Sequence, residues 1–147
     1  MPISSANRRA VLYSDRDHCL AIHGNAVISY SLQPPNPAFL AAWTAAVERL
    51  VKATDAAISV VTVIDSQARP PDDGSKREIR DTVTRHRRRI GTFAYVIEGH
   101  GFGAAALRSM ISLISLAARY PFPQKVFASI NDASAWTAQH TPTASAA

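Results

Sequence analysis

The sequence predicts an α/β protein with a mixed β-sheet, in which an N-terminal antiparallel meander is followed by strands that alternate with helices. Two observations predict this fold. Three short extended runs separated by turn residues occupy the first part of the chain, and apolar runs then alternate with segments of helical periodicity. The expected order is βββαβαβαβα, in which the strands that follow helices pair in parallel through right-handed crossovers.

Length and composition bound the organisation of the chain. The 147 residues suit one domain, which we expect at residues 9–139, between a loose N-terminus (1–8) and a disordered tail (140–147). The single cysteine, Cys19, excludes an intramolecular disulfide and a Cys-cluster metal site. Because no apolar run approaches ~20 residues and no signal-peptide pattern is present, we expect no membrane span and a cytoplasmic location.

The antiparallel meander is predicted from three runs at residues 10–14, 19–24 and 26–32, with turns at 15–17 and 24–25. Short β-branched runs joined by such turns are typical of neighbouring antiparallel strands.

The first helix is predicted by its cap and its periodicity. Asn36 is expected to cap it, with Pro37 at its first position, which is a favoured pairing. Apolar residues at helical spacing form the expected inward face: Phe39, Trp43, Val47 and Leu50.

Three later apolar runs predict the remaining strands. Residues 57–64 are β-branched and almost wholly apolar, which is typical of a central strand covered on both faces. Residues 92–97 and 125–130 predict two more strands, and Asn131 or Asp132 is expected to cap a short final helix.

A charged surface helix is predicted from Ser75, which forms a capping-box pattern with Glu78, to about Arg89. Its end is basic, because Arg85 and residues 87–89 flank His86, which we expect to be a half-buried packing residue. A solvated face explains such a run, and an acidic partner or nucleic-acid phosphate are the alternatives. Nucleic acid is not the expected partner, since no helix-turn-helix pattern or interleaved aromatic residue accompanies the run.

Residues 104–118 predict a helix that is apolar almost all round. Such a helix is either buried on most of its sides or meets a partner. We therefore expect a protein partner, or a homo-oligomer formed through helix 104–118, provided that the rest of the chain does not cover the helix.

The predicted element order and residues 63–66, Val-Ile-Asp-Ser, resemble the STAS domain of sulfate transporters and anti-sigma-factor antagonists. The four residues resemble the strand end that carries the antagonists' "fiDSSG" motif, although Gln67 and Ala68 replace the following Ser-Gly. Residues 127–136 resemble the C-terminal end of STAS domains. The resemblance implies a STAS-like fold and a regulatory, protein-binding role in bacteria.

A closer similarity, over residues 9–139, is to an uncharacterised group of STAS-like proteins common in myxobacterial genomes. Its patterns "GFxAAxxRS" and "PFPxKVF" correspond to residues 101–109 and 121–127. This resemblance implies a fold and no activity.

The glycine-rich turn at residues 99–103 is the main candidate for a ligand site. Gly99, Gly101 and Gly103, with His100 and Arg108, could bind an anion or a phosphorylated ligand at the start of the following helix. A dinucleotide site is disfavoured because the turn follows a late strand and lacks an acidic residue about 20 positions on. The simpler interpretation is that the glycines make a tight turn and let the helix pack closely on the sheet.

Ser66 is a phospho-acceptor candidate, because a hydroxyl at the carboxyl end of a strand can be phosphorylated. The roughly −1.5 to −2 charges so added would disrupt a partner surface. The alternative is a solvated loop serine.

No residue pattern predicts catalysis, a metal or a cofactor. His18, His23 and His100 match no metal-ligand spacing, and no catalytic set has motif support. The sequence thus predicts a non-enzymatic regulatory module that acts by protein contact, with a small-ligand carrier or sensor of anions, nucleotides or lipids as the alternative.

Overall fold

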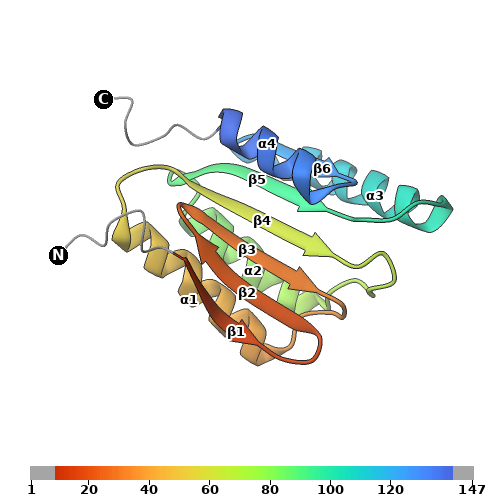
Figure 1. The fold of residues 1–147 in the computed structure, drawn as a ribbon, viewed down its shortest axis with the longest axis horizontal. Helices are drawn as coiled ribbons and strands as arrows, with labels where there is room; N and C mark the ends of the chain where they lie inside the picture. Colours follow the sequence, from red (N-terminus) through yellow and green to blue (C-terminus); the bar gives the residue numbers. More distant parts are fainter. Residues whose placement is uncertain (1–8, 141–147) are drawn as a thin grey trace.

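The computed structural model describes residues 9–140, which form one six-stranded sheet and four helices (Figure 1). The element order is the predicted βββαβαβαβα, and the strands lie in the sheet in their chain order, so the predicted fold class is confirmed. The strands are β1 (Arg9–Ser14), β2 (His18–His23), β3 (Ala26–Ser31), β4 (Ile58–Ile64), β5 (Ile90–Val96) and β6 (Gln124–Phe127).

The sheet has an antiparallel half and a parallel half. β1 pairs with β2 and β2 with β3 in antiparallel fashion, while β3, β4, β5 and β6 pair in parallel. β4 lies between β3 and β5 and is buried along most of its length, as its apolar sequence predicts.

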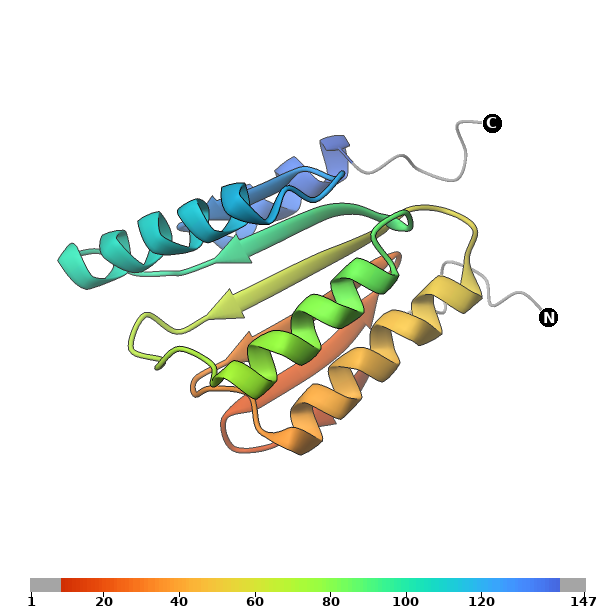
Figure 2. The same cartoon turned by 180° about the vertical axis from the view of Figure 1, so that it is seen from behind.

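Two helices, α1 (Pro37–Ala53) and α2 (Asp73–Arg85), cover one face of the sheet (Figure 2). The side chain of Asn36 accepts a hydrogen bond of 2.8 Å from the Phe39 amide, and Pro37 is the first helical residue, so the predicted start of α1 is confirmed. All four predicted inward residues of α1 are buried, in a core that also contains Leu20, Val27, Ile58, Val60 and Phe93.

One helix, α4 (Ile130–His140), covers the opposite face over β4, β5 and β6 (Figure 1). Its Ala133 is buried, and Trp136 packs against Phe127 with ring centroids 5.4 Å apart. On this side no described helix covers β1–β3, where Val11 and Tyr30 are 68% and 42% exposed.

The last helix, α3 (Phe102–Ala118), lies along the edge strand β6, on the same side of the sheet as α1 and α2 (Figures 1 and 2). It begins two residues before the predicted start at residue 104.

The predicted start and end of α2 were wrong. Asp72, not Ser75, caps the helix, because its carboxylate accepts a hydrogen bond of 2.7 Å from the Ser75 amide and places Ser75 in the first turn. The helix ends at Arg85 rather than Arg89, since residues 86–89 form turns and β5 already begins at Ile90.

The predictions for the C-terminal part need a similar correction. β6 ends at Phe127, because Ser129 already starts α4: its hydroxyl oxygen accepts from the amides of Asn131 and Asp132 at 3.1 and 3.4 Å. Asn131 and Asp132 are therefore first-turn residues and not caps. His140, placed in the predicted tail, ends α4, whereas the predicted loose N-terminus and the rest of the tail lie outside the described residues.

Candidate functional site

The carboxyl ends of the parallel strands β4 and β5 bring two predicted site residues together. Ser66 is half-buried in the loop after β4, and Gly99 follows β5. A Cβ atom added to Gly99 would lie 3.7 Å from the Ser66 hydroxyl oxygen and 3.9 Å from the Ala104 Cβ. The predicted phospho-acceptor thus lies beside the turn that leads into α3.

The glycines of this turn serve its backbone conformation. Gly99 and Gly101 have φ angles of +114° and +108°, which L-residues with side chains rarely adopt. A Cβ added at Gly101 or Gly103 would meet nothing within 4 Å, so neither glycine is needed for close packing of the helix on the sheet. The prediction of a tight turn is confirmed. The prediction that the glycines let the helix pack closely on the sheet is wrong for Gly101 and Gly103.

Arg108, the charged member of the predicted anion site, is bound by the turn itself. Its guanidinium donates to the carbonyl oxygens of Ile97 at 2.7 Å and Gly99 at 3.2 Å. His100 is exposed with Gly101 and Gly103. Arg108 therefore fixes the loop to α3, and binding of a small anion at this turn stays a prediction.

The outward face of α3 is an exposed apolar surface. Ala104 is the one residue of this helix that is buried. We use the term α3 surface for the large apolar side chains that remain exposed, with their exposed fractions: Phe102 (90%), Leu116 (75%), Leu113 (68%), Ile114 (60%) and Met110 (42%). Of the two alternatives predicted for this helix, burial on most sides is wrong.

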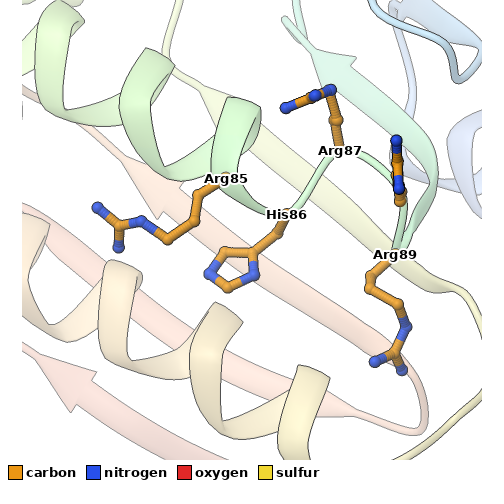
Figure 3. A pocket seen from close by; sticks show the side chains of 5 residues that line it. Arg85, His86, Arg87 and Arg89 are labelled. Atoms are coloured by element: carbon orange, nitrogen blue, oxygen red, sulfur yellow. The ribbon is translucent and has the colours of Figure 1, made fainter.

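The basic run after α2 is largely bound by its own chain. Arg85 forms an ion pair with Glu48 at 3.0 Å, and Arg87 donates to the Thr84 carbonyl oxygen at 2.8 Å. Arg89 donates to the carbonyl oxygens that end α1, those of Val51, Thr54 and Ala56. The run lines a pocket of about 250 Å³, in which the labelled guanidinium groups point in different directions (Figure 3). Arg87 and Arg89 thus bind carbonyl groups at the ends of α2 and α1, and the labelled arginines do not converge on a common point.

His86 is half-buried at the end of α2, as predicted. Its Nε2 atom is buried without a hydrogen-bond partner. Burial lowers the pKa of His86, because it disfavours the charged form; Glu48 opposes this effect, while Arg85 and Arg89 add to it.

Sequence reasoning missed a polar cluster at the β1–β2 turn. The Asp15 carboxylate accepts hydrogen bonds from the Tyr13 hydroxyl at 2.7 Å and the Asn36 side chain at 2.9 Å, and from the amides of Asp17 and His18. These bonds, that from Tyr13 foremost, hold the pKa of Asp15 well below its usual range. Asp15 thus ties the turn to the cap of α1.

His18 completes this cluster and is only 4% exposed. Its ring stacks on Phe39 at 4.6 Å, with Nδ1 3.1 Å from Asp15 Oδ1 and Nε2 3.1 Å from the carbonyl oxygens of Gln33 and Pro34. Since Phe39, Gln33 and Pro34 lie 15 or more residues away in the chain, the Asp15 turn was the only local sign of this cluster in the sequence.

The three histidines considered as metal ligands lie apart. His18 and His23 are at opposite ends of β2, about 16 Å from each other at ~3.3 Å per residue, and His100 lies in the glycine turn. Within residues 9–140, no three His, Cys, Asp or Glu side chains gather in a way that could hold a metal ion. No helix in this part of the chain is long and apolar enough to cross a membrane.

The fold has a counterpart among solved structures. An uncharacterised protein of the DUF3478 family from Shewanella loihica PV-4, described as having a SpoIIAA-like fold, matches with a TM-score of 0.57 and 12% sequence identity over 87% of this chain and 90% of that chain. The chain therefore has a STAS-like fold. No family model and no curated protein matches the sequence. Membership of the myxobacterial group stays a prediction.

Proposed function

We propose that this chain is a non-enzymatic regulatory module that acts by protein–protein contact, and that the α3 surface is its contact surface. The observation that carries this proposal is the outward apolar face of α3, on which Leu113 and Leu116 are 68% and 75% exposed.

The size and continuity of the α3 surface favour a binding role. Single exposed apolar residues are ordinary, but a contiguous exposed apolar patch of a few hundred Å² is typical of interaction sites. Five large apolar side chains on one helix form such a patch, and its helix adds only Ala104 to the buried residues. Folding of the chain therefore does not explain why these five positions carry large apolar side chains.

Two other surfaces are weaker candidates. The uncovered side of β1–β3 exposes Val11 and Tyr30 but has fewer large apolar side chains than α3. The basic run after α2 uses Arg85, Arg87 and residue 89 for contacts within the chain.

We further assign Ser66 as the position that regulates this contact. Its hydroxyl lies beside Gly99, so a phosphate added there would press on the turn that sets the start of α3. The STAS-like fold and the strand-end Asp65-Ser66 support this assignment.

Site-specific photo-crosslinking tests the contact surface. A photoreactive amino acid is placed at Leu113 and, as a control of equal exposure on another part of the chain, at Val11. In cells, the Leu113 position is expected to give discrete protein adducts and the Val11 position to give none of them. Equal adduct patterns at the two positions, or no adduct at Leu113, would overturn the proposal.

The regulatory position is tested in the same assay with Ser66→Asp and Ser66→Ala. The negative charge of Ser66→Asp is expected to lower the adduct yield at Leu113 at least several-fold, while Ser66→Ala keeps it. Equal yields in the two variants, with both proteins folded by circular dichroism, would remove Ser66 from the proposal.

A further inference from the structure

We infer that the partner of the α3 surface is a second copy of this chain, with the two α3 helices packed antiparallel about a two-fold axis beside Ser109. This inference rests on the proposed function and names the partner.

The exposed side of α3 carries a seam with the spacing of paired helices. Opposite the buried Ala104, the outward positions are separated by four, three, four and three residues: Phe102, Ala106, Ser109, Leu113 and Leu116. This alternation keeps one stripe facing a neighbouring helix. The partner that fits the stripe is therefore another helix with an apolar face.

The seam is complementary to itself when reversed. With Ser109 on the two-fold axis, Phe102 of one copy faces Leu116 of the other, and Ala106 faces Leu113. The large Leu113 side chain thus meets a small residue, and the two small serines allow the helices to approach closely at the centre. A two-fold interface requires such self-complementarity.

The seam is free of charged side chains along the length of α3. Arg108 is turned away and bound to Ile97 and Gly99, so no charged side chain interrupts the seam. Residues 97–99 lie beside Ala104 and Arg108, on the side of α3 away from the seam. The apolar seam can therefore pack against a second copy without burying a charge.

The apolar area places the pair among small interfaces. Complete burial of one large apolar side chain removes ~60–120 Å² from water, so the partly exposed α3 surface offers ~200–400 Å² per copy. Small neighbours such as Ala105 and Ala117 enlarge the contact. Interfaces of this size are at the weak, reversible end, so we expect a Kd of ~1–100 µM.

The oligomeric state is tested by sedimentation velocity over a concentration series. The wild-type protein is expected to pass from monomer to dimer, Leu113→Glu to remain monomeric, and Val11→Glu, at an equally exposed position, to dimerise as wild type. A monomer at all concentrations, or dimerisation of folded Leu113→Glu, would overturn the inference. The proposed function survives this result if the crosslinks at Leu113 join the chain to a different protein, and fails if there are none.

The orientation is tested by disulfide crosslinking in a Cys19→Ser background. Ser109→Cys is expected to crosslink with itself, and Ala106→Cys only with Leu113→Cys in a mixture. Self-crosslinking of Ala106→Cys would show a parallel pair and overturn the antiparallel arrangement.

Discussion

Helices α1 and α3 both have 17 residues and both are rich in apolar side chains, yet they have opposite surroundings. α1 buries Phe39, Leu40, Trp43, Ala46, Val47 and Leu50 in the core. α3 fully buries only Ala104 and leaves five of its large apolar residues exposed, with Leu107 and Ile111 half-buried.

The difference shows that apolar content does not by itself indicate burial. In α1 the apolar residues occupy one stripe, which the sheet covers, so they account for folding. In α3 they extend around the helix, while β6 at the sheet edge can cover only one side. Truncation of an apolar side chain should therefore lower the free energy of unfolding much more in α1 than in α3.

The largest expected effect is in α1. Trp43→Ala removes a side chain that is 4% exposed and should lower the free energy of unfolding by ~3–5 kcal/mol, whereas Leu116→Ala in α3 should change it by less than ~0.5 kcal/mol. Urea unfolding at a protein concentration where the chain is monomeric measures both. Similar losses in the two variants would mean that α3 is part of the core.

The next effect concerns the start of α1. Asn36→Ala removes the cap of the helix and the bond to Asp15, so we expect a loss of ~1–2 kcal/mol in the free energy of unfolding. Asn36→Asp, which can still accept from the Phe39 amide, serves as the comparison. If Asn36→Ala unfolds at the same urea concentration as wild type, the link between the turn and the helix contributes nothing.

At the start of α3 we expect a smaller effect. Arg108→Ala removes the two hydrogen bonds that hold the 97–99 loop, and the loss should be about 1 kcal/mol for this partly exposed group. Hydrogen exchange of the amides at residues 98–104 should increase, while that of α1 stays unchanged. Unchanged exchange in this loop would contradict the role given to Arg108.

The smallest expected effect depends on pH and arises at the end of α2. Because the pKa of His86 is lowered in the folded state, the unfolded chain binds more protons as the pH falls through the ordinary value of 6.5. As the pH falls through 6.5, the free energy of unfolding of the wild-type protein should therefore decrease relative to that of His86→Gln. Thermal unfolding of both proteins over this range measures the difference, and parallel curves would contradict it.

The sequence predicted those parts of the fold whose signals are local. The spacing of Phe39, Trp43 and Val47, with Asn36 and Pro37 before them, defines α1 without reference to the rest of the chain. At α2 a local signal misled, because Ser75 and Glu78 match a capping box while Asp72 forms the cap.

The candidate site was harder to predict because its contacts join distant residues. Ser66 and Gly99 become neighbours only because β4 and β5 pair in parallel, and Arg89 binds carbonyl groups more than 30 residues away. The exposure of α3 depends on its place at the edge of the sheet. The sequence showed an apolar helix, and only the fold decides between core and surface.

The single buried residue of α3, Ala104, has a consequence for how this protein can change over time. Substitutions along the outward side of the helix leave the packing of the sheet untouched, so the residues that determine binding specificity are separate from those that determine folding. A lineage carrying this fold could exchange one partner for another through a few changes in a single helix. The same separation makes α3 a practical position for redesigning what the domain binds.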